Sequence, residues 1–417
     1  MGVLYAETDQ REPALAAFQK VTTLKATWSD GWGYTGIILA RQGKYAEASA
    51  AYHKALRLNP NDATAWGNLG AAYANINQHD EAIDAYRQAT RLTPEWAHAW
   101  VGLGKALTEK SQLHEAVMAL ERATHLLPDS FQAWYALGRA QERLGRYHQA
   151  ADAFAKTTTL APTDASAWYA LGLTYAKGQK TQEALAAYQK AVELKPDMVD
   201  AIVALGGQYG RLGQDEQAIP LFEQALALEP FHVQAWNNIG YARLRLGTLD
   251  QAIEALQKAI KLQPDYIDAW VNLGEAYLRK RELAKAASTL QQALALAPKA
   301  VRARLMLGVI YGALGAHEQA IDHLQQVVDT VPSFAEAWYE LGNALLRSQQ
   351  PDAAITAYSE AVKLKPTWTP VYLSLGLAYT QQGNHQKVQE VYEQLRAIDA
   401  HAAQTYAEKI LQAPPAP

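Results

Sequence analysis

The stretch Ala167–Pro196, AWYALGLTYAKGQKTQEALAAYQKAVELKP, contains two short apolar patterns separated by a polar turn. In its first half, Trp168, Leu171, Gly172 and Tyr175 stand at i, i+3, i+4 and i+7, which places them on one side of a helix. The second half has the same spacing in the residues Ala184, Leu185, Ala187, Tyr188, Ala191 and Val192. Neither helix is long enough to bury its apolar face alone, so the pair needs neighbouring pairs to pack against.

This helix pair belongs to a repeat of 34 residues that runs through nearly the whole chain. Glycine recurs at that interval from Gly2 to Gly376, and proline from Pro60 to Pro366. Alanine recurs from Ala14 to Ala354. Because proline cannot continue the hydrogen bonding of a helix, each of these prolines ends a second helix. The three registers agree without an insertion, so we expect no second domain within the repeats.

Composition excludes several classes of protein. The 417 residues are 49% hydrophobic and 19% charged, which is enough apolar surface for a packed core. The net charge of -4 gives no overall field for nucleic acid or an anionic membrane. Cysteine is absent, which removes disulfides and thiolate sites. The longest apolar runs are about five residues, too short to span a bilayer.

The pattern Trp-x-x-Leu-Gly-x-x-Tyr, followed by Ala, an aromatic residue, Ala and Pro, resembles the tetratricopeptide repeat (TPR). The resemblance extends from about Met1 to Asp399. It implies an all-α fold, a right-handed superhelical solenoid of tetratricopeptide helix-turn-helix repeats. Some signature residues are replaced: tryptophan by Ile202, Arg304 and Tyr372, and tyrosine by Gln141 and Arg243.

The repeat register predicts four segments. We expect a partial first repeat at 1–28, eleven tandem repeats at 29–402, a capping helix at 403–412 and a disordered tail at 413–417. The capping helix carries Gln404, Glu408 and Lys409, polar residues suited to the outer face of a terminal repeat. Met1-Gly2 aligns with the middle of a first helix, so we expect the N-terminal end of the array to be uncapped.

Motifs for catalysis or cofactor binding are weak. Gly31–Gly36, GWGYTG, matches a dinucleotide-binding loop, but Gly36 belongs to the repeat register and no strand precedes it. His79, His114 and His148 fall at the turns of three consecutive repeats, about 10 Å apart by helix packing, too far to share a metal ion. We therefore expect no enzyme activity, no cofactor and no metal.

The resemblance further implies that the first helices line a concave groove for an extended peptide or a helix of a protein partner. The groove residues expected from the register are Tyr135, Arg139, Arg143, Tyr169, Lys177, Gly207, Arg211, Asn237, Tyr241, Arg245, Glu275 and Arg279. The paired Lys and Asn clamp of chaperone-binding members is missing. An asparagine ladder is interrupted, with Asn68, Asn238 and Asn272 at its position.

Five consecutive repeats place a cation at one position late in the first helix: Arg143, Lys177, Arg211, Arg245 and Arg279. One interpretation is a row of charges for an acidic or carbonyl-rich ligand. The other, which we prefer, is that a helix C-terminus favours Lys or Arg through its dipole.

These observations predict a non-catalytic protein-interaction scaffold that binds no nucleic acid and does not insert into a membrane. Two alternatives stay open: a self-assembling array, head-to-tail through the uncapped N-terminal end, or the regulatory repeats of a longer enzyme. The opening MGVLYAETDQ has no signal-peptide features, so the cytoplasm is the default expectation. A periplasmic or extracellular location stays open if further sequence precedes Met1.

Overall fold

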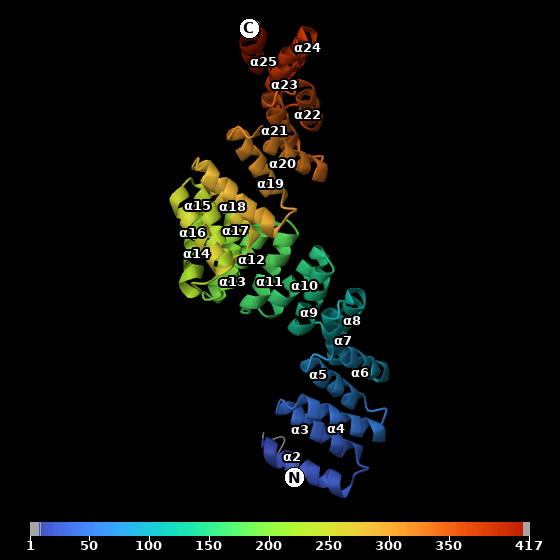
Figure 1. Ribbon diagram of the computed structural model, residues 1–417. Coiled ribbons are helices and arrows are strands. Elements are labelled where there is room, and N and C mark those ends of the chain that lie inside the picture. Colours follow the sequence, from blue (N-terminus) through green and yellow to red (C-terminus); the bar gives the residue numbers. More distant parts are fainter. Residues whose placement is uncertain (1–7, 9, 412–417) are drawn as a thin grey trace. The chain divides into compact units, whose positions relative to one another are not determined.

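The computed structural model describes residues 8 and 10–411, whose regular secondary structure is entirely helical (Figure 1). The first helices of the pairs are α3 (Ser29–Arg41), α5 (Ala63–Asn75), α7 (Ala97–Glu109), α9 (Phe131–Arg143), α11 (Ala165–Lys177), α13 (Val199–Arg211), α15 (Val233–Arg245), α17 (Ile267–Arg279), α19 (Val301–Ala313), α21 (Ala335–Arg347) and α23 (Thr369–Gln382). The second helices are α2 (Arg11–Leu24), α4 (Tyr45–Leu58), α6 (His79–Leu92), α8 (Leu113–Leu126), α10 (Tyr147–Leu160), α12 (Thr181–Leu194), α14 (Asp215–Leu228), α16 (Leu249–Leu262), α18 (Leu283–Leu296), α20 (His317–Thr330), α22 (Pro351–Leu364) and α24 (His385–Ile398). The expected all-α solenoid of helix-turn-helix repeats is confirmed.

The helices form two compact units. The first ends at Gln208 and the second begins at Tyr209, so the boundary falls within α13. Residues 1–7, 9 and 412–417 lie outside the described residues. The expected segment 1–28 is therefore described only in part, and the expected tail lies outside. The proposed repeat boundaries stay a prediction.

Repeating glycines allow the two helices of a pair to approach closely. A Cβ added at Gly172 would lie 2.6 Å from the ring of Tyr188, and one added at Gly138 would lie 2.9 Å from Phe154. These distances are shorter than side chains tolerate, so the aromatic residue of the second helix occupies the space left by the glycine of the first. This contact explains why both residues recur at the same interval.

The turn within each pair requires a left-handed backbone residue. The six glycines at this position have φ from 76° to 80°. The remaining described turns use non-glycine residues with φ from 60° to 62°: Asn77, Ser111, Gln179, Arg281 and Gln349. The turn geometry is thus kept where glycine is absent, although a left-handed conformation costs an ordinary L-residue roughly 1–2 kcal/mol.

Tryptophan and proline of the repeat are joined by a hydrogen bond. The indole Nε1 of Trp168 donates to the carbonyl of Pro162 at 3.0 Å, and Trp270 donates to Pro264 at 2.8 Å. Tyr372, which replaces a tryptophan, donates its hydroxyl to Pro366 at 2.7 Å. The large ring therefore holds the loop between repeats as well as filling the core.

A second polar pair links successive repeats across 20 residues. Tyr277 and Tyr311 bond through their hydroxyls to glutamine amides of the preceding second helix, Gln257 at 3.1 Å and Gln291 at 2.7 Å. Arg243, which stands where these repeats have tyrosine, instead donates to Glu223 at 3.0 Å. Where arginine replaces the tyrosine, glutamate therefore replaces the glutamine that bonds to it.

The last repeat is covered by α25 (Ala400–Tyr406) and the π-helical η1 (Ala407–Leu411). The sequence places this helix at 403–412, whereas α25 begins at Ala400 because the Asp399 carboxylate caps the amides of His401 and Ala402, each at 3.0 Å. Tyr406 is fully buried and donates to the carbonyl of Val388 at 2.8 Å.

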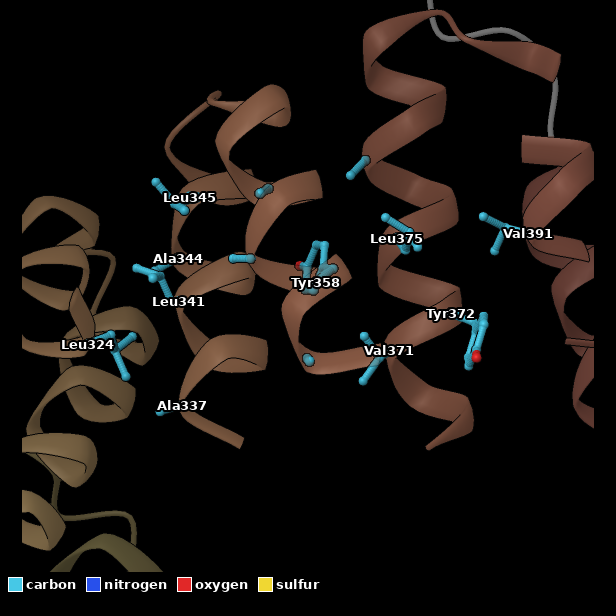
Figure 2. Packing of buried hydrophobic residues seen from close by; sticks show 14 of the residues in the cluster. Leu324, Ala337, Leu341, Ala344, Leu345, Tyr358, Val371, Tyr372, Leu375 and Val391 are labelled. Carbon is cyan, nitrogen blue, oxygen red and sulfur yellow. The ribbon is translucent and has the colours of Figure 1, made fainter. Parts of the chain in front are cut away.

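Figure 2 shows part of the core beneath this end, with Leu324, Leu341, Tyr358, Val371 and Val391 on successive helices. Each helix contributes a few apolar side chains to the contact with the next one. The core is therefore spread along the unit. The helix α25 covers its last part with a buried face and keeps its polar residues on the exposed face.

Candidate functional site

The residues expected to face a groove all lie on first helices. Tyr135, Arg139 and Arg143 lie on α9, and Tyr169 and Lys177 lie on α11, within the first unit. The others are Gly207 and Arg211 on α13, Asn237, Tyr241 and Arg245 on α15, and Glu275 and Arg279 on α17. Since α15 and α17 belong to the second unit, the expected groove residues form two separate groups.

Tyr135 and Tyr169 occupy the same register position one repeat apart. Each ring contacts the aromatic residue of its own second helix, Tyr135 meeting Phe154 edge-on at 5.4 Å between centroids and Tyr169 meeting Tyr188 at 6.0 Å. Burial raises the pKa of both phenols, so both hydroxyls stay protonated at neutral pH. Both side chains remain half-buried, which leaves ring surface available to a ligand.

Arg139 is an exposed cation on the same helix as Tyr135. Its positive charge lowers the pKa of the Tyr135 phenol, opposing the larger effect of burial, so the two groups are close in space. Among the described residues Arg139 has no hydrogen-bond or ion-pair partner. It is therefore free to meet a ligand carboxylate or carbonyl oxygen.

The two cations at the end of these helices already contact the preceding repeat. Arg143 donates to the hydroxyl of Ser111 at 3.0 Å and lies 3.9 Å from Glu109. Lys177 lies 2.7 Å from the carboxylate of Glu142. Both cations remain exposed, so these are surface pairs of modest strength.

In the second unit the equivalent arginines bind backbone carbonyls. Arg245 donates to the carbonyl of Gly210 at 2.6 Å, Arg279 to that of Leu244 at 3.1 Å, and Arg347 to that of Gly312 at 3.3 Å. Each acceptor lies 35 residues earlier, at the end of the preceding first helix, where carbonyls lack partners within the helix. These contacts favour the interpretation in which the cation serves a helix terminus, here the terminus of the neighbouring helix.

Asn237, by contrast, is only 6% exposed and belongs to a polar network that runs from the buried Asn237 and Asn272 to the exposed Arg302. Its carbonyl oxygen accepts from Asn272 at 2.9 Å, and the Asn272 oxygen accepts from Arg302 at 3.1 Å. Arg302 also donates to Glu275, and its guanidinium lies 6.0 Å above the ring of Tyr241. Side chains from α15, α17 and α19 are thereby connected.

Arg302 is absent from the residues expected to line the groove. It stands at the register position of Gln234 and Asp268, the second residue of a first helix. Its contacts with Asn272 and Glu275 depend on how α19 packs against α17, and the register does not contain that information.

Several family models match the sequence. A tetratricopeptide repeat model matches residues 335–368, and a second one matches 369–401. The TPR domain of cytochrome c-type biogenesis protein H matches 221–336, and the C-terminal domain of cilia and flagella-associated protein 70 matches 2–157 and 62–230. The chain belongs to the tetratricopeptide repeat family. No curated protein matches the sequence.

Solved structures of TPR proteins are similar to this chain. The APC/C hetero-tetramer Cut9–Hcn1 is 16% identical, with 99% of this chain and 95% of that chain covered at a TM-score of 0.51, which is a likeness of fold. YrrB, described as a TPR protein with an unusual peptide-binding site, is 26% identical over 45% of this chain and 96% of its own, with a TM-score of 0.41. Yeast Tom70 is 16% identical, covering 93% of this chain and 96% of that one, with a TM-score of 0.44.

TPR scaffolds with this fold are typically protein-interaction modules and are generally non-catalytic. Within residues 8 and 10–411 of this TPR array, no cluster of three or more His, Asp or Glu side chains is placed to hold a metal ion. The described helices also include none with the length and apolar character that crossing a membrane requires.

Proposed function

We propose that this TPR array is a non-catalytic scaffold that binds an extended peptide segment of a partner protein on the exposed faces of α9 and α11. The observation that carries the proposal is the trio Tyr135, Tyr169 and Arg139. It combines two half-buried rings with an exposed cation that has no partner among the described residues.

Tyr135 and Tyr169 hold the same register position on successive first helices, and α10 packs against both of these helices. An extended chain that crosses both first helices would meet the two rings in turn. Arg139, one helical turn after Tyr135, would pair with a carboxylate or carbonyl oxygen of the same chain.

The remaining cations would contribute less. Arg143 and Lys177 would have to share their charge with Ser111, Glu109 and Glu142, which already contact them. Exposed ion pairs are worth about 0.2–1 kcal/mol each. The aromatic contacts and Arg139 would thus provide most of the affinity.

Peptides selected on the intact protein from a random displayed library would provide the ligand for the test. We expect the double variant Tyr135→Ala, Tyr169→Ala to bind the selected peptide at least tenfold more weakly, a loss of about 1.4 kcal/mol in binding free energy, as measured by fluorescence polarisation. Arg139→Glu should also lower the affinity for the peptide, and this loss of affinity should become smaller as added salt screens the charge.

Matched controls lie on second helices. Arg91→Glu on α6 reverses the charge of another exposed arginine, and Tyr147→Ala on α10 removes another partly buried tyrosine ring. Both controls should bind as well as the wild type. Equal affinity in the Tyr135→Ala, Tyr169→Ala variant and the wild type, with helical content unchanged, would refute the proposed surface.

A further inference from the structure

Arg304 on α19 is a polar residue at the register position of the repeat tryptophan. In the second unit Trp236, Trp270 and Trp338 hold this position, and each indole donates to a proline carbonyl six residues earlier at 2.8 Å. Arg304 makes the same bond, donating to the carbonyl of Pro298. It keeps the polar contact of the indole but does not supply the volume of the ring.

The second helix of the same repeat has another polar replacement. The other described second helices end in leucine, or in isoleucine at Ile398, whereas α20 ends in Thr330. Thr330 therefore removes a branched apolar side chain from the end of α20. Two residues that are large and apolar elsewhere in the array are thus polar in one repeat.

A cavity of about 260 Å³ lies between Arg304 and Thr330. Its wall consists of Pro298, Lys299, Val301, Arg304, Gln326, Val327, Asp329 and Thr330. The cavity thus joins the start of α19, the loop before it and the last turns of α20.

The position of Gln326 shows what fills this space in other repeats. Gln326 is equivalent to Lys54 and Lys258, whose ammonium groups lie 4.1 Å and 4.5 Å from the ring centroids of Trp32 and Trp236. Gln326 itself accepts a hydrogen bond from Arg304. The guanidinium of Arg304 therefore holds the polar contacts of the missing indole, and the cavity lies beside it.

We propose that this cavity is a binding site for a planar aromatic ring bearing an N–H or O–H donor, with indole as the simplest member of the class. Pro298 and the partly exposed Val301 provide apolar contact for the edges of the ring. The flat guanidinium of Arg304 provides a cation for its π-face. The carboxylate of Asp329 accepts one bond from Gln325 at 2.8 Å and retains lone pairs for the donor of the ring.

The size of the cavity agrees with this class of ligand. A sealed apolar cavity of roughly 150 Å³ takes up benzene. The cavity here is larger but open to solvent, so a bicyclic ring would fit in it with one side exposed. The same chemistry is offered by a free indole and by a tryptophan side chain of a peptide, so the test includes both sources.

The test uses the full chain with ¹³C-labelled valine methyl groups. Val301 and Val327 line the cavity, and Val391 lies elsewhere in the same unit as an internal reference. Added indole should shift the first two signals saturably, with a dissociation constant of about 1 mM or below, and should leave the third unchanged. N-acetyltryptophanamide stands for the peptide source, and cyclohexanol supplies a donor without a planar ring.

Two variants close the cavity by restoring the residues of the other repeats. Arg304→Trp should abolish the indole shifts and raise the melting temperature, because its own ring fills the space. Thr330→Leu narrows the cavity from the side of α20 and should lower the affinity for indole at least tenfold. A proportional, non-saturating response of the wild type would overturn the proposal. So would equal binding of cyclohexanol, or unchanged indole affinity in either folded variant.

Discussion

Arg245 donates from its guanidinium to the carbonyl of Gly210 at 2.6 Å, and its Nε lies 3.1 Å from the carboxylate of Asp215. The Asp215 side chain is only 5% exposed and that of Arg245 is 33% exposed, so the carboxylate is removed from water while the arginine still reaches the surface. The arginine thus joins the end of one first helix to the next repeat. A residue chosen from the sequence as a ligand contact also has a structural role.

We expect Arg245→Met to lower the free energy of unfolding by about 2–3 kcal/mol, because it leaves a buried carboxylate without its partner. Arg143→Met should lower the free energy of unfolding by less than about 1 kcal/mol, since the carboxylate near Arg143, that of Glu109, is 3.9 Å away and exposed. Urea denaturation measures both. Replacing Asp215 by Ala in the Arg245→Met background should recover part of the loss. Equal losses in the two single variants would argue against a buried ion pair.

Gly172→Ala and Gly207→Ala should change stability in opposite directions. The new methyl at Gly172 would lie 2.6 Å from Tyr188, and overpacking costs about 1–3 kcal/mol. At Gly207 an added Cβ has no atom within 4 Å, so the better helix propensity of alanine should add about 0.5–1 kcal/mol. Thermal unfolding monitored by circular dichroism shows whether each variant is more or less stable than the wild type. A loss at Gly207 would contradict the open space at that face.

Gln179→Gly should stabilise the first unit by about 0.5–1 kcal/mol, since glycine adopts the left-handed region without a steric penalty. Gln179 holds φ at 61° in its turn. Asn77→Gly is the matched control, because asparagine tolerates the same conformation better and should gain less. Urea midpoints compare the two variants. A larger gain at Asn77 than at Gln179 would show that backbone strain is not the cause.

His53 should make stability depend on pH. Its Nε2 lies 2.5 Å from the hydroxyl of Tyr73. Burial, followed by the charge of Arg57, lowers the pKa of its imidazole. The unfolded chain therefore takes up this proton at higher pH than the folded one. Stability should be fully present above about pH 6.5 and fall as the pH is lowered through that value.

His53→Gln tests this dependence with the residue that other repeats use at the same place, where Gln257 bonds to Tyr277. Stability at pH 7.5 should change by less than about 0.5 kcal/mol, and its decrease between pH 7 and pH 5 should become smaller. Exposed His148→Gln serves as the control. An identical pH profile for wild type and His53→Gln would rule out His53 as the titrating group.

Part of the candidate site could be read from the register. Tyr135, Tyr169 and Arg139 keep exposed surface on first helices, and their contact with a ligand stays a prediction. Asn237 instead bonds to Asn272 and is buried. The register indicates which side of a helix a residue occupies, whereas burial depends on the length of the side chains that the next helix places over it.

The sequence by itself determined the helix pairs, their turns and the close approach at Gly172, because these features repeat in a local pattern. It also determined the family. Only the tertiary structure decided that Arg245 binds Gly210 and Asp215, and that Arg304 leaves a cavity beside Thr330. These relationships join residues on different helices. They arise from how one repeat packs on the next, and this packing is set by side-chain volumes and hydrogen-bond geometry that a period of 34 residues does not specify.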